Sequence, residues 1–223
     1  NISREQVKQK YKLVFNHDRA GRLIDTQEFR NIEFPLKNFE PDLIEDLLTV
    51  ASKTVQIVND KIRIDHLYTE RKVTPLDLYL ANNNLEMAIP AVIDYGKAIK
   101  ELALSNIFPG DFLLKNFGVT RQGRVIFYDY DELCLITDCN FRSLPKFKYS
   151  EDEMRPNDWF FVGKNDIFPE EFIRFIALKP ALKATFLDHH GDILTPLFWQ
   201  RINELHLNKK PLEVAPYLEL KKS

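Results

Sequence analysis

The segment from residue 111 to residue 131 gathers side chains that could bind a metal ion and phosphate. Its polar residues are Asp111, Lys115, Asn116, Asp129 and Asp131. Carboxylate and amide oxygens are the hard ligands that Mg²⁺ and Mn²⁺ accept, and these ions leave their other positions to water and phosphate oxygens. If the fold brings these residues to one cleft, the chemistry that they predict is phosphoryl transfer.

A β-hairpin is predicted to bring the two ends of this segment together. Residues 117–119 and 124–130 read as its strands, and the glycine of a tight turn lies in residues 120–123. The second strand of a hairpin runs back along the first. Asp129 should therefore return to the neighbourhood of Asn116, thirteen residues earlier.

Helices and strands are predicted on both sides of the hairpin, which gives an α+β fold class. Pro41 suits the first turn of a helix, and an apolar stripe from Leu43 to Val58 extends that helix to Asn59. A polar hinge at residues 69–72 is expected between a strand and a helix. The predicted helices cover residues 3–17, 41–59, 75–80, 86–105, 169–177, 179–188 and 196–205, and the predicted strands outside the hairpin cover residues 29–36 and 61–68.

The composition argues against several classes of protein. The chain has 223 residues, with 33 acidic and 31 basic side chains and a formal net charge of −2 at pH 7. This balance does not fit a nucleic-acid binder, which usually carries a basic excess. No apolar run reaches the length of a membrane span, so neither nucleic acid nor a membrane is an expected partner. Cys134 and Cys139 are the only cysteines and are expected to be free thiols in a cytoplasmic protein.

The glycines give no sign of a phosphate-binding loop. The chain has seven glycines, and they lie far apart, whereas a glycine-rich nucleotide loop needs them close together. The chain begins at Asn1, directly at a predicted helix start. We therefore expect a fragment of a longer protein.

The spacing of the polar residues is similar to that of protein kinases. In those enzymes a catalytic Asp is followed five positions later by an Asn, and then by a hairpin that ends in a metal-binding Asp. Asp111, Asn116 and Asp129 have this order. However, Leu113 stands where a protein kinase has Lys, and Asp131 stands where it has Gly. An ordinary protein kinase is therefore not expected.

Longer runs of the chain carry a more specific resemblance. These runs are His17-Asp18-Arg19-Ala20-Gly21-Arg22, Asp25-Thr26-Gln27-Glu28-Phe29, Asn106-Ile107-Phe108-Pro109-Gly110-Asp111, Lys115-Asn116-Phe117-Gly118-Val119-Thr120, Phe127-Tyr128-Asp129-Tyr130-Asp131-Glu132, Asn140-Phe141-Arg142 and Phe168-Pro169-Glu170-Glu171-Phe172. They resemble one family, the bacterial isocitrate dehydrogenase kinase/phosphatases, and the resemblance covers nearly the whole sequence.

The resemblance implies a protein-kinase-like α+β fold. Residues 1–70 would be the remainder of its small lobe, and residues 71–223 a mostly helical large lobe that carries the catalytic loop and the metal-binding hairpin. The regulatory domain of the family, its ATP loop and its strand lysine would precede Asn1, so weak or absent ATP binding is expected of this fragment.

The resemblance also gives the polar residues roles. Asp111 would orient a substrate serine hydroxyl or accept its proton, while Asn116 and Asp129 would hold Mg²⁺ or Mn²⁺ beside ATP. Lys115 would add positive charge, and Asp131 would orient water for a phosphatase reaction at the same site. Read without the resemblance, Lys115 is a surface charge and Asp131 a cap of the following segment.

Four further residues enter only through the resemblance. Asp25 lies in the family-specific N-terminal run and is carried over as an active-site residue without an assigned chemical role. Glu70, Arg71 and Val73 would form the hinge that contacts adenine.

The expected function is that of a bifunctional, ATP-dependent serine kinase and phosphatase that acts on isocitrate dehydrogenase. Such an enzyme divides carbon between the citric acid cycle and the glyoxylate bypass. Isocitrate dehydrogenase and adenine nucleotides are the expected partners, and a homodimer is compatible with the sequence. Two alternatives stay open: another kinase-like phosphotransferase that acts on a small molecule, and a kinase-like binding module without catalysis.

Overall fold

The computed structural model describes residues 4–24, 26–145 and 161–210. The chain folds as two compact units. The ribbon unit comprises residues 24–71, and the helical unit comprises residues 1–23 together with residues 72–223. The chain passes between the two units at residues 23–24 and 71–72. Helices and strands occur in both units, which confirms the α+β class. No helix among the described residues is both long and apolar enough to cross a bilayer.

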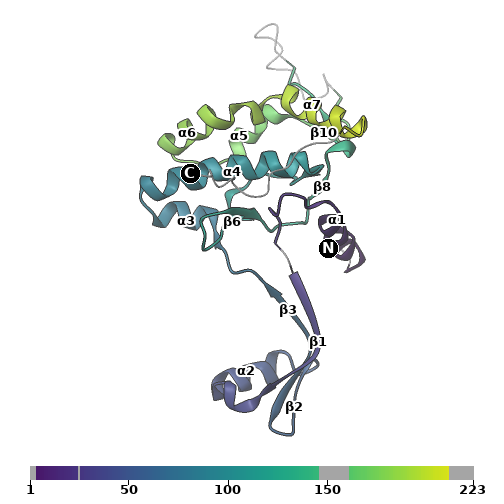
Figure 1. The fold of residues 1–223 in the computed structure, drawn as a ribbon, viewed down its shortest axis with the longest axis vertical. Helices are drawn as coiled ribbons and strands as arrows, with labels where there is room; N and C mark the ends of the chain where they lie inside the picture. Colours follow the sequence, from purple (N-terminus) through teal and green to yellow (C-terminus); the bar gives the residue numbers. More distant parts are fainter. Residues whose placement is uncertain (1–3, 25, 146–160, 211–223) are drawn as a thin grey trace, which may run out of the picture. The chain divides into compact units, whose positions relative to one another are not determined.

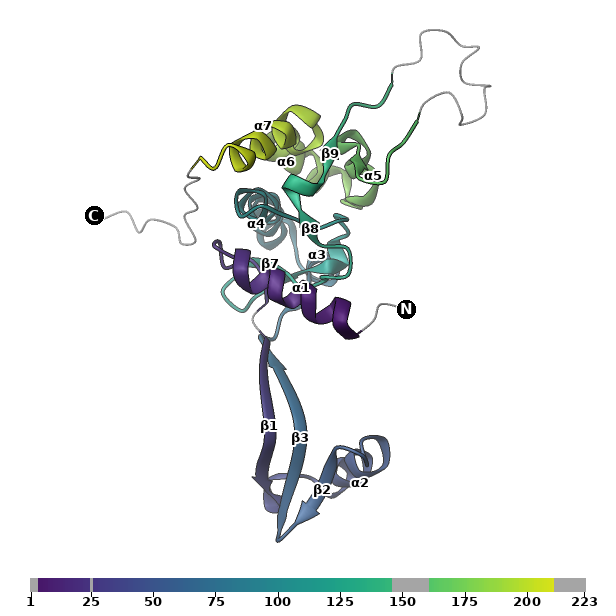
Figure 2. The ribbon, with the colours of Figure 1, turned by 90° about the vertical axis from the view of Figure 1, so that its right-hand side faces the viewer.

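The ribbon unit is an antiparallel sheet with one helix. Its strands have the order β1-β3-β2, and the long strands β1 and β3 run side by side from Thr26↔Glu70 to Pro35↔Lys61 (Figure 2). Both strands were predicted, although β3 extends two residues further and includes Glu70. The elements of this unit are β1 (Thr26–Pro35), η1 (Leu36–Asn38), α2 (Pro41–Val50), β2 (Val55–Val58) and β3 (Lys61–Glu70).

The predicted helix over residues 41–59 is wrong in its second half. Helix α2 begins at Pro41 as predicted but ends at Val50, and residues 55–58 form strand β2. Asn59 and Asp60 join β2 to β3 with φ values of 49° and 58°. A two-residue turn with both φ values positive is the connection that a tight hairpin prefers, and Asn and Asp tolerate it. Because of this turn, residues 55–58 fold back and pair with β3 as a strand instead of continuing the helix.

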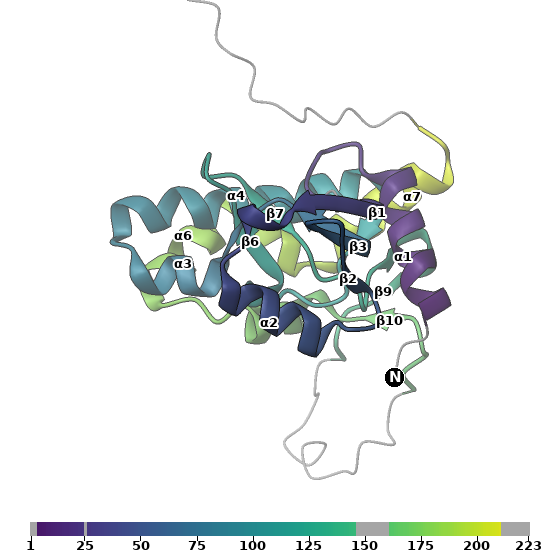
Figure 3. The same ribbon diagram turned by 90° about the horizontal axis from the view of Figure 1, so that it is seen from below.

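The helical unit is built around helix α4, whose side chains are largely buried. Helices α6 and α7 pack on one side of α4, and the small sheet β4-β6-β7 lies on the other side (Figure 1). Helix α3 precedes α4 and packs against it (Figure 3). The elements are α1 (Arg4–His17), β4 (Thr74–Pro75), α3 (Leu76–Asn82), α4 (Leu85–Leu104), β5 (Ile107–Phe108), η2 (Leu114–Asn116), β6 (Phe117–Val119), β7 (Val125–Phe127), β8 (Cys134–Leu135), η3 (Ile136–Asp138), β9 (Asn140–Phe141), β10 (Asp166–Ile167), η6 (Pro169–Glu171), α5 (Phe172–Phe175), α6 (Pro180–His190), η7 (Gly191–Leu194) and α7 (Pro196–Leu207).

The helices predicted in this unit are confirmed with shifts of a few residues at their ends, except that residues 169–177 hold a 3-10 turn (Pro169–Glu171) and a four-residue helix (Phe172–Phe175) instead of one longer helix. Helix α4 begins where the side chain of Asn84 accepts a hydrogen bond from the backbone N–H of Met87, a standard N-cap. An aromatic cluster then anchors the loop that follows α4. Phe108 and Phe112 both pack on Trp199 of α7, with ring centroids 5.4 and 6.0 Å away. The core therefore fixes the residues on both sides of the loop that ends in Asp111.

The contact between α4 and α6 gives a first stability prediction. The ring of buried His190 lies against Gly96, where an added Cβ would come within 2.1 Å of it, and His190 Nε2 contacts the Ile93 carbonyl oxygen at 2.9 Å. Gly96→Ala is therefore expected to lower the free energy of unfolding by about 1–3 kcal/mol, as overpacking typically does. Gly191→Ala is the matched control, since its Cβ meets nothing within 4 Å and its φ is −58°.

Urea unfolding of the two glycine variants beside the parent protein measures this difference. Equal unfolding midpoints for Gly96→Ala and Gly191→Ala would show that the ring moves aside without cost.

Candidate active site

The loop between β5 and β6 closes on itself through Asp111. The carboxylate Oδ1 of Asp111 accepts hydrogen bonds from Asn116 Nδ2 at 2.7 Å and from the backbone N–H of Leu113 at 3.1 Å. Asn116 is buried and Asp111 half-buried. The five-residue spacing thus joins the two side chains directly. Both of these hydrogen bonds are made to Oδ1 of the Asp111 carboxylate.

The predicted hairpin is present and returns to Asn116. Strands β6 and β7 pair through Phe117↔Phe127, and the backbone N–H of Tyr128 donates to the Asn116 carbonyl oxygen at 3.1 Å. Asp129 follows immediately, so it lies beside the Asp111–Asn116 pair. The carboxylate of Asp129 accepts a hydrogen bond from the backbone N–H of Asp131 at 3.3 Å. The structure therefore brings Asp111, Asn116 and Asp129 together, and leaves Asp131 exposed at the end of the turn.

Tyr128 and Asp77 also belong to this neighbourhood. The hydroxyl of Tyr128 donates to the carbonyl oxygen of Lys115. Burial raises the pKa of Tyr128, and the carboxylates of Asp77 and Asp129 raise it further. Asp77 is in the first turn of α3 and extends the acidic character of the site. The side chain of Lys115 is exposed.

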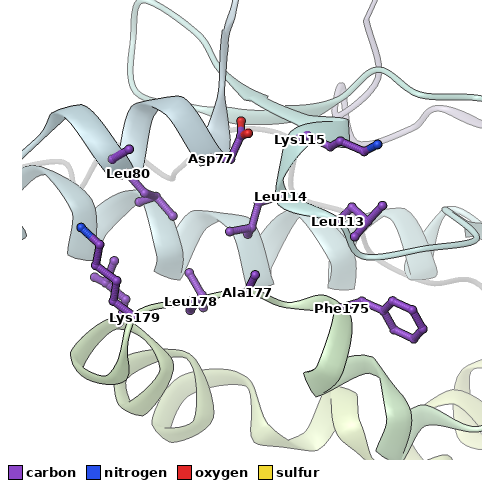
Figure 4. Close-up of a pocket in the computed structure, with 11 residues that line it drawn as sticks. Asp77, Leu80, Leu113, Leu114, Lys115, Phe175, Ala177, Leu178 and Lys179 are labelled. Atoms are coloured by element: carbon purple, nitrogen blue, oxygen red, sulfur yellow. The ribbon is translucent and has the colours of Figure 1, made fainter.

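A groove opens next to the loop, with a volume of about 370 Å³. Its walls are mainly apolar and come from α3, from η2 and from the segment that leads into α6, while Asp77 and Lys115 lie at its edge (Figure 4). A mainly apolar groove of this volume with a few charged side chains at its edge is typical of a binding site. The lining residues are Asp77, Leu80, Ala81, Leu113, Leu114, Lys115, Phe175, Ala177, Leu178, Lys179 and Leu182.

A buried tyrosine supports the loop from below. The hydroxyl of Tyr95, in α4, donates to the Phe112 carbonyl oxygen at 2.7 Å. Tyr95 is fully buried, and both burial and the nearby Asp111 carboxylate raise the pKa of its hydroxyl. The hydroxyl therefore stays protonated and holds the backbone directly after Asp111.

Of the predicted hinge residues, Val73 belongs to the helical unit and lies at the hairpin. Val73 packs against Gly118, where an added Cβ would be 2.6 Å from Val73 Cγ2. Glu70 is the last residue of β3 in the ribbon unit, where its carboxylate accepts a hydrogen bond from Thr26 Oγ1 at 2.7 Å. Thr69 and Glu70 continue the β1–β3 ladder, so strand β3 takes up the first two residues of the polar stretch predicted at residues 69–72. Arg71 also belongs to the ribbon unit, and Asp25 lies outside the described residues.

The oxygen ligands at this site fit a divalent cation that is shared with phosphates. Asn116 and Asp129 offer an amide oxygen and a carboxylate, and Asp129 has no ion pair with a basic side chain in the part of the chain that the structure describes. Nor do the described residues contain a group of three or more His, Cys, Asp or Glu that could enclose a metal. Mg²⁺ commonly binds through one or two carboxylates and takes its other ligands from water and substrate phosphates.

Comparison with known proteins identifies the family of this chain. Residues 1–219 match the family model described as the isocitrate dehydrogenase kinase/phosphatase (AceK) kinase domain. The chain belongs to this family. Its relatives include proteins named isocitrate dehydrogenase kinase/phosphatase from Anaeromyxobacter sp. (strain Fw109-5) and from Methylibium petroleiphilum (strain ATCC BAA-1232 / LMG 22953 / PM1), each 46% identical over 217 residues. The match covers 97% of this chain but only 38% and 35% of these relatives.

The run His17-Asp18-Arg19-Ala20-Gly21-Arg22, one of those that carry the family resemblance, has a structural role in this chain. Asp18 caps the turn after α1, because its carboxylate accepts hydrogen bonds from the backbone N–H groups of Ala20, Arg22 and Leu23 at 3.2, 3.3 and 3.2 Å. Leu23 then forms a parallel bridge with Phe127 of β7. This run is thereby fixed against the β6–β7 hairpin.

Arg22 connects the same run to α4 through a buried ion network. Its guanidinium binds both carboxylate oxygens of Asp94, at 2.6 and 2.9 Å, and also contacts Glu101 and the Val125 carbonyl oxygen. Burial alone would lower the pKa of Arg22, but the hydrogen bonds to Asp94 and Glu101 outweigh it and leave this pKa raised. The Arg22 carbonyl oxygen accepts the backbone N–H of Phe127 at 2.7 Å. Arg22 therefore positions β7, two residues before Asp129.

Four residues around the site were missed by sequence reasoning: Asp77, Asp94, Tyr95 and Tyr128. Asp94 and Tyr95 lie inside a predicted helix whose pattern shows only its apolar stripe. Tyr128 had a signal, since it lies in the predicted second strand of the hairpin, directly before Asp129. The position of Asp77 depends on how α3 packs against η2, and no local pattern indicates that contact.

Proposed function

We propose that this chain is part of the catalytic domain of a bifunctional enzyme that phosphorylates isocitrate dehydrogenase on a serine, using ATP, and also removes that phosphate. The observation that carries the proposal is the hydrogen bond between Asp111 and Asn116, together with the hairpin that brings Asp129 back beside Asn116. Family membership supports the substrate, because both relatives are named isocitrate dehydrogenase kinase/phosphatase. The two units are then the parts of a protein-kinase-like fold, with the helical unit as its large lobe.

In this proposal the loop prepares the substrate for attack. The hydrogen bond from Asn116 fixes the Asp111 carboxylate on Oδ1, so that Oδ2 is oriented toward the serine hydroxyl and accepts its proton. Tyr95 holds the loop backbone in place while this happens. Lys115 attracts the phosphate that is transferred.

Asn116 and Asp129 would hold the divalent cation. When bound with ATP, Mg²⁺ neutralises the charge that develops on the transferred phosphoryl group. The backbone hydrogen bond between Tyr128 and Asn116 keeps Asp129, the next residue along the chain, adjacent to Asn116. The hairpin therefore sets the distance between the proton acceptor and the metal ligands.

The remaining assigned residues take supporting roles. Asp131 is exposed beside Asp129 and would orient the water molecule that removes phosphate from phosphoserine. Val73, with Glu70 and Arg71, would contact the adenine of ATP, and Asp25 would contribute to the same active site. Reversible phosphorylation of isocitrate dehydrogenase in the cytoplasm would then set the flux between the citric acid cycle and the glyoxylate bypass.

Phosphate transfer with the full-length protein tests this function. The protein is incubated with Mg²⁺ and ATP that is radiolabelled at its γ-phosphate, together with isocitrate dehydrogenase, unrelated proteins, sugars and aminoglycosides. We expect label on a serine of isocitrate dehydrogenase, and release of that label as phosphate once ATP is removed. Preferential labelling of a small molecule would replace the proposal with a small-molecule phosphotransferase, and binding of isocitrate dehydrogenase without any label would replace it with a binding module.

A further inference from the structure

The two cysteines of the chain lie next to each other in the helical unit. Cys134 is in β8, and the short helix η3 turns the chain back so that Cys139 Sγ lies 3.5 Å from Cys134 Sγ. Both are free thiols. Two sulfur atoms in van der Waals contact need little movement to form a bond.

The two thiols have different surroundings. Cys134 is half-buried and lies near the ammonium group of Lys10, which donates a hydrogen bond to the adjacent Leu133 carbonyl oxygen. Cys139 is only 9% exposed, and its sulfur contacts the Leu135 carbonyl oxygen at 3.4 Å. The more accessible sulfur thus has a cation close by, while the other sulfur is buried directly behind it.

The pKa values of the two thiols are also shifted in opposite directions. The hydrogen bond from Cys139 lowers the pKa of Cys134, and Lys10 lowers it further. The same hydrogen bond and burial raise the pKa of Cys139. A thiolate is the reactive form of cysteine, and peroxide-sensitive cysteines commonly combine a lowered pKa, some exposure and a second cysteine nearby. Cys134 has the features of the attacking sulfur, and Cys139 those of the sulfur that completes a disulfide.

We propose that Cys134 and Cys139 form a peroxide-reactive pair that closes reversibly into an intramolecular disulfide. The Cys134 thiolate attacks one oxygen of a hydroperoxide, so that an S–O bond forms, the O–O bond breaks and an alcohol, or water from hydrogen peroxide, leaves. Sulfur loses two electrons to the peroxide. Cys139 then attacks the resulting sulfenic acid; the S–S bond forms, the S–O bond breaks, and hydroxide leaves as water with the Cys139 proton. A dithiol reductant reverses the reaction.

Peptide mapping of the full-length protein tests the pair directly. After treatment with hydrogen peroxide and alkylation of free thiols, trypsin releases residues 125–142 as one peptide that contains both cysteines and no internal Lys or Arg. We expect this peptide to lose the mass of two hydrogen atoms, to resist alkylation and to recover both thiols with dithiothreitol. A second cut between Thr137 and Asp138 should leave two pieces joined until they are reduced. A peptide whose thiols both stay alkylatable would overturn the proposal.

Serine variants test the order of the two steps. In Cys139→Ser the sulfenic acid of Cys134 has no partner, so dimedone should trap it, whereas Cys134→Ser should take up little dimedone at Cys139. Equal labelling of the two variants would contradict the assignment of Cys134 as the attacking sulfur. Lys10→Met should slow the peroxide reaction severalfold, because it removes the cation that favours the thiolate. An unchanged rate would exclude the contribution of Lys10.

Discussion

Asp129→Asn in the full-length protein is expected to lower the rate of phosphate transfer to isocitrate dehydrogenase by about 10²–10³-fold, the loss typical when one group that stabilises transition-state charge is removed. The substitution keeps the size of the side chain and an oxygen that can accept the hydrogen bond from the backbone N–H of Asp131. It removes one negative charge beside Asn116. The variant should also need more Mg²⁺ for half-maximal rate, because a neutral amide binds a divalent cation more weakly than a carboxylate does.

Initial rates as a function of Mg²⁺ concentration, at saturating ATP and isocitrate dehydrogenase, measure both effects. Asp188→Asn is the matched control, since the Asp188 side chain is 84% exposed in α6, and it should leave the rate and the Mg²⁺ requirement unchanged. Unchanged transfer by a folded Asp129→Asn protein would remove Asp129 from the proposed metal site.

The juxtaposition of Asp111, Asn116 and the end of the hairpin was predictable from the sequence because the contacts between them are local. Asp111 and Asn116 are five residues apart and meet within one turn of chain. The hairpin then needs only a tight turn, which Gly123 makes with a φ of 78°. Short loops leave few ways to connect such residues, so type and spacing together predict the juxtaposition.

Elements that depend on a single turn or on tertiary packing were not predictable in the same way. Strand β2 was predicted as helix because Val55 and Val58 continue the apolar stripe of α2, and only the positive φ values of Asn59 and Asp60 decide for a strand. Tyr95 lies in a helix that was predicted, but its hydrogen bond to Phe112 depends on how that helix packs on the loop. The periodicity of apolar residues predicts which residues share one face of a helix, but it does not predict which part of the protein that face contacts.

The buried ion network shows this limit most clearly. Arg22 meets Asp94 across 72 residues of sequence and Glu101 across 79. No spacing rule joins positions so far apart, and an isolated Arg in a charged run resembles a solvent-exposed side chain. The side chain of Arg22 is only 1% exposed and that of Glu101 only 8%. The sequence alone therefore does not predict the ion network of Arg22.

Arg22→Met is expected to lower the free energy of unfolding by about 3–5 kcal/mol, the usual cost when one partner of a buried ion pair is removed. The substitution keeps an unbranched side chain but leaves the carboxylates of Asp94 and Glu101 without their main cation. Urea unfolding at pH 7 measures the loss. Arg201→Met is the control, because Arg201 is exposed in α7, and such surface changes usually stay within about 0.5 kcal/mol. Arg22→Lys should fall between the two, since Lys cannot bind both oxygens of Asp94 in the plane of a guanidinium.

The pH dependence separates a lost ion pair from lost packing. In the parent protein burial acts to raise the pKa of Asp94, but the hydrogen bonds from Arg22 outweigh it and leave this pKa lowered. Asp94 therefore stabilises the fold above its unfolded pKa of about 3.9, and that stabilisation is lost as the pH falls through the folded pKa.

In Arg22→Met burial remains without the guanidinium, so the pKa of Asp94 should rise above its unfolded value. Its contribution is then present at low pH and lost as the pH rises. The stability difference between the two proteins should thus shrink as the pH is lowered from 7 to about 4. A difference that stays constant over this range would assign the loss to packing alone, and would show that the charge of Arg22 is not what holds β7 in place.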